Sequence, residues 1–176
     1  MRKPRFLRRR ASRDPSTGLM SRRRFERELR RLGRKESKLA VVLGQIEGWS
    51  ELSGHWGHAP GEEALRRAYA AVETRVPVDT VLARVGWIEY AALLPEGHDP
   101  VEVGRALRKA VEEVDTGVEL PNRLTVSIGV YEPLFSSRVD LDEAQRALGA
   151  AIVLGGNRVV VYRNGEYVDV TITGGI

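Results

Sequence analysis

The amino-acid sequence predicts an α+β fold, in which a mostly antiparallel sheet carries helices largely on one side. Two observations predict it. Apolar runs typical of strands alternate along the chain with segments whose apolar residues recur at helical spacing. In addition, two pairs of apolar runs are each separated by a short turn sequence, which predicts two β-hairpins. With 176 residues, the chain is long enough for one domain with a core of its own.

The first half of the chain contains one cationic helix, one buried strand and one further helix. Phe25, Leu29 and Leu32 recur at helical spacing, and Gly33 is expected to end that helix. The continuous apolar run at 39–43 is typical of a central strand covered on both faces. We expect a loop after it, up to Glu62, and then a helix with Leu65, Ala68 and Val72 inside that Pro77 ends.

The second half begins with a hairpin, whose runs at 81–85 and 90–94 flank a break at Gly86. Asp99-Pro100 then predicts the start of a helix. A strand is expected at 124–131, followed by a helix that Asp140 and Glu143 begin as a capping box. Asn164-Gly165 predicts a final hairpin between 158–162 and 167–172, in which Val168, Val170 and Ile172 share the packed face.

This order of elements is that of a ferredoxin-like palm with an extra C-terminal strand. The expected division is a basic arm at 1–13, a body at 14–163 and a hairpin extension of the same domain at 164–176. A fold of this kind provides a position for chemistry but does not establish any.

Charge is divided unevenly along the chain. Residues 1–35 hold 15 Lys and Arg against 3 Asp and Glu, or +12, and the remainder holds 13 against 21, or −8. Residues 1–13, which include Arg8, Arg9 and Arg10, have too few apolar side chains to fold alone, so we expect a disordered arm. It either contacts an acidic partner, an anionic membrane or nucleic acid, or lies loosely on the acidic body. We expect no sequence-specific nucleic-acid binding, because the body repels phosphate.

Composition excludes several classes of protein. The chain has no cysteine, which excludes disulfides and thiol chemistry and is compatible with a reducing cytosol. No apolar run approaches ~18 residues and no signal-peptide core follows the basic start, so we expect a cytoplasmic protein without an integral membrane segment.

Several motifs resemble those of GGDEF domains, the diguanylate cyclases of bacterial cyclic di-GMP signalling. Residues 14–25 resemble the family's opening Asp-x-Leu-Thr-Gly-Leu-x-Asn-Arg-Arg-x-Phe at most positions. Residues 125–130, Thr-Val-Ser-Ile-Gly-Val, match the family nearly letter for letter, and residues 155–159 resemble its closing Gly-Arg-Asn-Arg-Val. The signature itself is altered to Gly86-Trp87-Ile88-Glu89-Tyr90, so the chain resembles a degenerate member.

The resemblance implies a reaction that this chain is poorly equipped to catalyse. Cyclases of this type join two GTP molecules with the help of divalent metal ions held by carboxylates. The resemblance places the two side-chain metal ligands at Gln45 and Ile88, neither of which is anionic, although magnesium prefers anionic oxygen. Its feedback-inhibition motif is absent at 77–80. We therefore expect no catalytic residue, no metal and no cofactor; the vestigial nucleotide pocket would comprise Gln45, Glu47, Ser53, Glu62, Trp87, Ile88, Glu89 and Ile152.

Each of two groups of side chains around that pocket has two possible roles. Glu47, Glu62 and Glu89 could bind a cation or guanine, or they are solvated or paired with arginine. Three tryptophans, Trp49, Trp56 and Trp87, either fill the pocket or present an aromatic surface to a partner. The candidate partner surface consists of these tryptophans together with Arg8, Arg9 and Arg10 of the arm.

The function expected from the sequence is that of an inactive GGDEF-like signalling adaptor that binds a protein with an acidic surface. The alternatives are a sensor that binds GTP or cyclic di-GMP without turnover, a weak cyclase, and a nucleic-acid binder that works through the arm. A homodimer is a further alternative for the partner.

Overall fold

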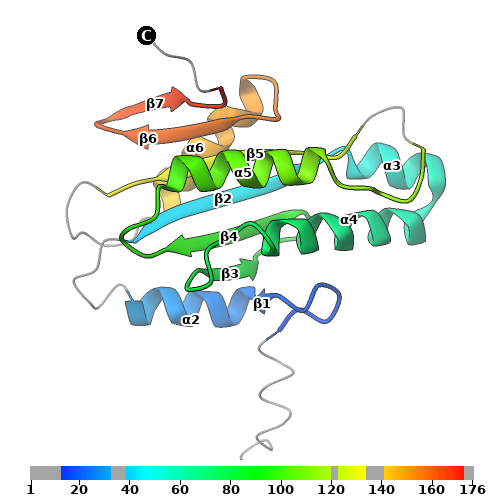
Figure 1. Ribbon diagram of the computed structural model, residues 1–176, viewed down its shortest axis with the longest axis horizontal. Helices are drawn as coiled ribbons and strands as arrows, with labels where there is room; N and C mark the ends of the chain where they lie inside the picture. The colour runs from blue at the N-terminus through cyan, green and yellow to red at the C-terminus, as the bar shows by residue number, and fades with distance from the viewer. Residues whose placement is uncertain (1–12, 33–38, 120–122, 134–140, 173–176) are drawn as a thin grey trace, which may run out of the picture.

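The computed structural model describes residues 13–32, 39–119, 123–133 and 141–172 (Figure 1). The predicted arm, apart from Arg13, and the predicted helix boundaries at Gly33 and Asp140 lie outside these residues. In the described part of the chain, no helix is long and apolar enough to cross a membrane. The helices are α2 (Arg22–Leu32), α3 (Trp49–Trp56), α4 (His58–Glu73), α5 (Pro100–Glu112) and α6 (Leu141–Val153). The strands are β1 (Met20–Ser21), β2 (Ala40–Glu47), β3 (Val81–Arg84), β4 (Glu89–Leu94), β5 (Thr125–Tyr131), β6 (Val159–Arg163) and β7 (Glu166–Asp169).

The described strands form one sheet in the order β1-β3-β4-β2-β5-β6-β7. Strand β2 lies at its centre and pairs antiparallel with both β4 and β5. The hairpins β3–β4 and β6–β7 are antiparallel as well, whereas the pairs β1–β3 and β5–β6 are parallel. The prediction of a mostly antiparallel α+β sheet is therefore confirmed.

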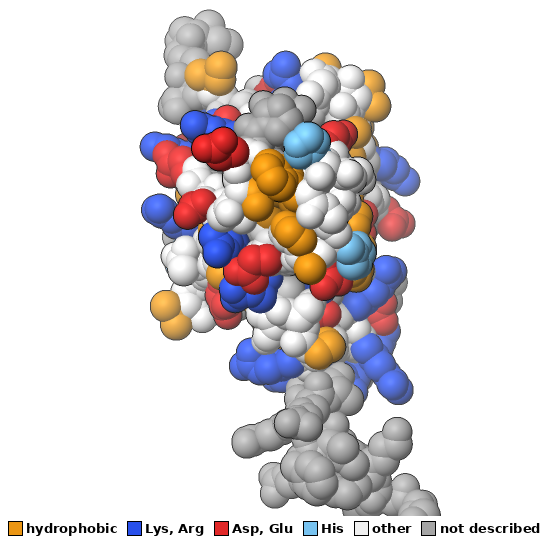
Figure 2. All heavy atoms as spheres, turned by 90° about the vertical axis from the view of Figure 1, so that its right-hand side faces the viewer, with side chains coloured by type: hydrophobic (Ala, Val, Ile, Leu, Met, Phe, Trp, Pro, Cys, Tyr) orange, Lys and Arg blue, Asp and Glu red, His pale blue; other side chains and the backbone are white. Residues whose placement is uncertain are grey.

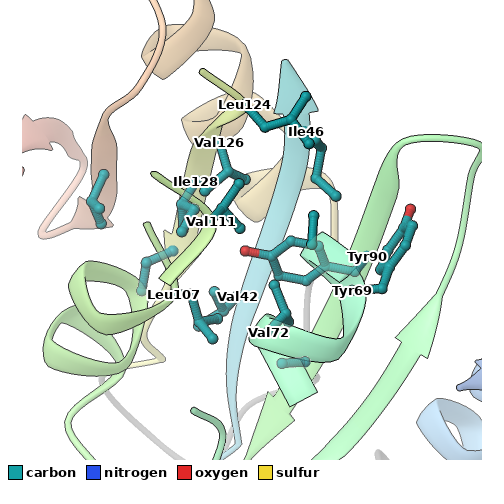
Figure 3. Packing of buried hydrophobic residues seen from close by; sticks show 14 of the residues in the cluster. Val42, Ile46, Tyr69, Val72, Tyr90, Leu107, Val111, Leu124, Val126 and Ile128 are labelled. Atoms are coloured by element: carbon teal, nitrogen blue, oxygen red, sulfur yellow. The ribbon is translucent and has the colours of Figure 1, made fainter. Parts of the chain in front are cut away.

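Helices cover both faces of this sheet, so the expectation that they lie largely on one side is wrong. Helices α3, α4 and α5 pack on the face that carries Val42 and Ile46 (Figure 3), and α2 and α6 pack on the opposite face, which carries Val41 and Leu43. The physical reason lies in β2, whose successive side chains point to opposite faces and are apolar on both. Each face therefore needs a covering layer.

The loop predicted between residues 49 and 62 is also wrong, because this stretch forms α3 and the first turn of α4. Gly48 and Gly57 bound α3 with φ angles of 83° and 93°, which glycine adopts without the steric cost of a side chain. Leu52 is the buried residue that anchors α3 to the core. Pro60 lies in the first turn of α4, where its missing N–H would have no helical partner. One buried residue in eight gave too weak a periodic signal to predict a helix.

The two final strands confirm the predicted hairpin but not its predicted packing. Asn164 and Gly165 have φ angles of 55° and 86°, as a two-residue hairpin turn requires. All four residues of β7 are exposed, however, and Ile172 is 81% exposed beyond the end of the strand. Of the three predicted core residues in this segment, only Val170 packs against the core. The reason is that β7 is an edge strand at the margin of the sheet.

A pair of tyrosines occupies the core between α4 and the sheet. The rings of Tyr69 and Tyr90 meet edge to face at 6.5 Å (Figure 3). Tyr90 also fills the space beside Gly44, where an added Cβ would lie 2.2 Å from the Tyr90 ring. The two hydroxyls differ: that of Tyr69 lies 3.2 Å from the carbonyl oxygens of both Trp87 and Glu89, whereas that of Tyr90 is buried without a hydrogen-bond partner.

This difference predicts opposite effects for the same substitution. Tyr90→Phe removes a buried unpaired hydroxyl and should raise the free energy of unfolding by about 1 kcal/mol. Tyr69→Phe removes a hydroxyl that holds the turn between β3 and β4, and should lower the free energy of unfolding by about 1 kcal/mol. Urea denaturation of both variants beside the parent protein measures the two changes. A loss of stability in Tyr90→Phe would show that its hydroxyl has a partner.

Candidate functional site

The turn between β3 and β4 lies at the end of the sheet, next to the end of β2. The backbone N–H groups of Val85 and Gly86 donate to the carbonyl of Glu89, and Ile46 of β2 donates to the carbonyl of Ile88 at 2.8 Å. A Cβ on Gly86 would lie 2.3 Å from Oε2 of Glu89, so the Glu89 carboxylate occupies the space that a side chain at 86 would need. The altered signature is thus closed by hydrogen bonds within the turn and tied to β2 by one more.

Arg84 is the buried cation that holds this turn to two other segments. Its Nε donates to the carbonyl of Gly86 and its Nη2 to the carbonyl of Trp87. Its Nη1 donates to Oδ1 of Asp14 at 3.1 Å and to the hydroxyl of Ser16. The guanidinium also lies 5.1 Å from the ring centres of both Tyr69 and Trp87, within the range of cation–π contact.

Asp14 receives several donors on a single carboxylate oxygen. Oδ1 accepts hydrogen bonds from the Ser16 hydroxyl, from both the backbone N–H and the hydroxyl of Thr17, and from Arg84. Burial raises the pKa of Asp14, but these hydrogen bonds together outweigh it and lower the pKa to about 2. The turn at 14–18 is therefore fastened to the hairpin turn by a charged group that stays ionised at neutral pH.

Trp49 and Trp87 form an aromatic cluster with His58. The two indoles meet edge to face at 5.6 Å, and His58 stacks on Trp87 at 6.2 Å. Trp49 packs partly against the core, whereas Trp87 and Trp56 are 49% and 42% exposed. Trp56 contacts His55 instead. Figure 2 shows hydrophobic side chains gathered in the middle of this end of the molecule, beside histidine side chains.

Gln45, Glu47 and Glu89 lie on the other face of the sheet, the face that α6 covers. Gln45 and Glu47 follow Val41 and Leu43 at intervals of two along β2 and so point the same way. Glu89 is the cross-strand neighbour of Gln45. Ile88 instead packs against the core cluster beneath α4 and α5. The two positions that the resemblance assigns to metal ligands are therefore a neutral amide and a partly buried apolar side chain that packs against the core.

The Glu47 carboxylate is bound by the protein itself. Its oxygens accept hydrogen bonds from the Ser127 hydroxyl at 2.7 Å, the Thr125 hydroxyl at 3.2 Å and the backbone N–H of Asn157 at 3.0 Å. Glu47 therefore joins β2, β5 and the segment after α6. Glu47 is partly buried and makes no ion pair with a described arginine, so these hydrogen bonds replace the roles expected from the sequence if it did not bind a ligand.

The remaining predicted site residues are divided between the two sides of the sheet. Ser53 lies on α3 and bonds to the carbonyl of Ser50, and Glu62 lies on α4 with one oxygen 3.4 Å from His58. Ile152 lies on α6, on the opposite side, and is partly exposed. Among the described residues, no group of three or more His, Cys, Asp or Glu side chains could hold a metal ion. Arg8, Arg9 and Arg10 lie outside the described residues.

A pocket of about 300 Å³ opens beside Trp87, between α4 and the turn at 14–18. Glu62 and Trp87 are the two predicted residues that line it; the sequence did not identify the others, Ser16, Thr17, Ala59, Glu63, Leu65, Arg66 and Arg84. The motif at 14–25 was recognised, but no pattern in the sequence indicates that its turn lies against α4.

Comparison with known proteins gives a consistent result. The family model for "Diguanylate cyclase, GGDEF domain" matches residues 11–157. Diguanylate cyclase DosC of Escherichia coli K12 is 25% identical over 145 compared positions, and the match covers 79% of this chain and 32% of DosC. The chain thus spans about a third of the length of this curated relative.

Solved structures show the same fold. Diguanylate cyclase SiaD of Pseudomonas aeruginosa, solved in complex with its activator SiaC, has a TM-score of 0.78 and 24% identity, covering 89% of this chain and 64% of SiaD. The structure of the coiled coil and GGDEF domain of DgcB from Caulobacter crescentus, solved with c-di-GMP, has a TM-score of 0.77 and 22% identity. The match covers 89% of this chain and 88% of the DgcB chain.

The low pKa of Asp14 predicts how stability changes in acid. Because the folded pKa of about 2 lies below the ordinary 3.8, the carboxylate contributes stability above pH 3.8 that is lost as pH falls through 2. Asp14→Asn should therefore flatten the decline of the unfolding free energy over this interval. Glu63→Gln is the control. The pKa of Glu63 is also lowered to about 2 by Arg66 and Arg67, but solvent screens this exposed group. The slope of Glu63→Gln should therefore stay close to that of the parent. Equal slopes for Asp14→Asn and the parent, from thermal unfolding at several pH values, would contradict the role given to Asp14.

Proposed function

The chain belongs to the GGDEF domain family, and we propose that it acts in cyclic di-GMP signalling as a member that binds a protein partner and has no cyclase activity. The observation that carries the proposal is the set of side chains at the positions that the resemblance assigns to the metal site. Gln45 supplies no charge, Ile88 packs against the core, and Glu47 is bound by Thr125, Ser127 and Asn157. A hard divalent cation needs anionic oxygen ligands, and Glu89 alone does not provide them.

Other positions support the loss of turnover. Trp87 stands where the family has the second glycine of its signature, and its side chain occupies the space beside Trp49 and His58. Ile152 stands where the family has a phosphate-binding lysine and offers no charge to a triphosphate. These losses affect separate parts of the site, so restoring one would not restore the reaction.

The exposed aromatic surface supports a protein partner. Trp56 and Trp87 keep about half of their surface open to solvent at one end of the molecule, beside His55 and His58. Tryptophan is enriched at the positions that contribute most to protein–protein binding, because it buries a large area and keeps a polar N–H. SiaD, one of the structural relatives, was solved with a protein activator. We expect the partner here to contact Trp56 and Trp87.

A second candidate is binding of GTP or cyclic di-GMP without turnover. The pocket beside Trp87 favours it, because it is lined by an aromatic ring and by Glu62, which the resemblance places at the family's guanine-reading position. DgcB was solved with c-di-GMP. Calorimetric titration of the chain with each nucleotide decides this candidate, since heat of binding that Glu62→Ala abolishes would support it.

The absence of turnover is tested directly. Incubation of the purified chain with GTP and either magnesium or manganese should give no cyclic di-GMP by chromatography. Gln45→Asp combined with Ile88→Asp should not restore activity, because Trp87 and Ile152 remain. Any cyclic di-GMP that is formed by the parent chain and disappears on Glu89→Ala would overturn this part of the proposal.

The partner surface is tested by comparing aromatic residues at two ends of the molecule. Proteins captured from the source cells by the parent chain should be lost with Trp56→Ala/Trp87→Ala and kept with Tyr167→Ala, an equally exposed aromatic residue on β7. The Trp87→Ala change should cost about 1 kcal/mol of stability, well below the roughly 3 kcal/mol of Leu52→Ala, because Leu52 is buried. Identical capture by both surface variants would remove the tryptophans from the interface.

A further inference from the structure

Three arginines form a row along the exposed face of α2. Arg23, Arg27 and Arg30 are spaced by four and three residues, so they lie one above the other on one side of the helix. All three are exposed, whereas Phe25 on the opposite side is buried and Leu29 and Leu32 pack beside it. The row spans about 10 Å of helix, at 1.5 Å per residue. We call it the α2 arginine row.

Most other arginines in the described part of the chain have partners. On α2 itself, Arg22 pairs with Glu26 and Arg31 with Glu28, so the two acidic side chains of the helix are already used. Of the described arginines, five have side chains that make no ion pair, hydrogen bond or ring contact: Arg23, Arg27, Arg30, Arg75 and Arg123. Three of these five form the row, which is therefore a local excess of uncompensated charge.

This arrangement costs stability in the isolated domain. Arg23 and Arg27 are like charges four residues apart, a spacing that destabilises a helix by a few tenths of a kcal/mol. The first turn of α2 contains arginines and no acidic residue, so cations lie at the positive end of the helix dipole. The side chains of Arg23, Arg27 and Arg30 themselves make no ion pair or hydrogen bond within the described residues that would offset these costs, which points to an anionic partner outside the domain.

The row lies at one margin of the molecule. Figure 1 shows α2 along the lower edge, beside β1 and β3, and Figure 2 shows Lys and Arg side chains gathered at the same lower end. Residues 1–35 carry +12 and the rest of the chain −8. A flat anionic surface could therefore contact the basic margin while the acidic body stays away from it.

We propose that the α2 arginine row docks this domain onto the anionic phospholipid headgroups of a membrane surface. The guanidinium groups bind phosphate in a planar, bidentate manner, and a cluster of arginines on a helix is typical of such binding. Helix α2 exposes no large apolar side chain among the described residues, so the contact is electrostatic, without insertion into the bilayer. It is consequently reversed by salt.

Nucleic acid, the other common phosphate-bearing partner, fits the row less well. Helix α2 contains only Arg, Phe, Glu and Leu, so it has no Asn or Gln to read base edges and no exposed aromatic ring on which bases could stack. The acidic body would also repel a long polyanion that extends past the margin. Headgroups on a flat surface require neither feature.

The experiment compares two double variants of the full chain with equal loss of charge. Arg27→Gln/Arg30→Gln removes two members of the row, and Arg75→Gln/Arg123→Gln removes two other exposed, unpaired arginines. Binding is measured by co-sedimentation with vesicles of phosphatidylcholine alone and of phosphatidylcholine mixed with phosphatidylglycerol, at low and high salt.

We expect the parent chain to bind only the mixed vesicles, and only at low salt. At about fivefold for each arginine, the row variant should bind about 25-fold more weakly, and the matched control should retain most of its affinity. The row variant should also unfold at the same or a slightly higher temperature, because repulsion is relieved and no contact is lost.

Three results would overturn the proposal. Equal affinity of the two double variants would assign any binding to net charge or to other segments. No binding of the parent chain to mixed vesicles would exclude the surface altogether. Tighter binding of the parent to a duplex oligonucleotide than to vesicles, lost in the row variant, would assign the row to nucleic acid. None of these depends on Trp56 or Trp87, so they leave the proposed protein-binding function to be judged separately.

Discussion

The buried guanidinium of Arg84 is the interaction on which the arrangement of the site depends. It bonds to the carbonyls of the β3–β4 turn and to Asp14 and Ser16 of the N-terminal turn, and it lies against the rings of Tyr69 and Trp87. Those groups come from three separate stretches of the chain. A buried cation without such partners would be strongly unfavourable. The contacts that compensate the charge of Arg84 therefore hold these three stretches together.

Compensation of a charged group by nearby polar groups also explains the arrangement on the opposite face of the sheet. Glu47 could be taken for a remnant metal ligand, yet its carboxylate joins β2, β5 and Asn157 through hydrogen bonds. Gln45 beside it needs no counterion, and Ile88 contributes to the core. The positions that the resemblance assigns to the metal site are here bound by, or packed against, the protein's own groups. This supports the proposed role in binding without turnover.

Two exposed surfaces contain side chains that make few or no contacts within the domain. The half-exposed indoles of Trp56 and Trp87 lie at the end of the sheet, and the α2 arginine row lies at its β1 margin. One is aromatic and the other is cationic and uncompensated, so they suit different partners. A domain placed on an anionic surface by α2 would keep its tryptophans free for a protein. The edge strand β7 is exposed as well, so the C-terminal hairpin is a third accessible surface.

The sequence by itself determined every described strand except the two-residue β1, the hairpin turns and most of the helices, because these depend on local periodicity and on turn residues such as Asn164-Gly165 and Asp99-Pro100. Its motifs also indicated the family and the missing charges at Gln45 and Ile88. Helix α3 was missed since a single buried leucine gives no periodicity, and β7 was predicted to be half-buried because alternation does not reveal that a strand lies at an edge. The tertiary structure alone decided the partners of Arg84 and Glu47 and the exposure of Trp87. Those properties depend on contacts between residues tens of positions apart, and no local pattern specifies which distant groups a charge will meet.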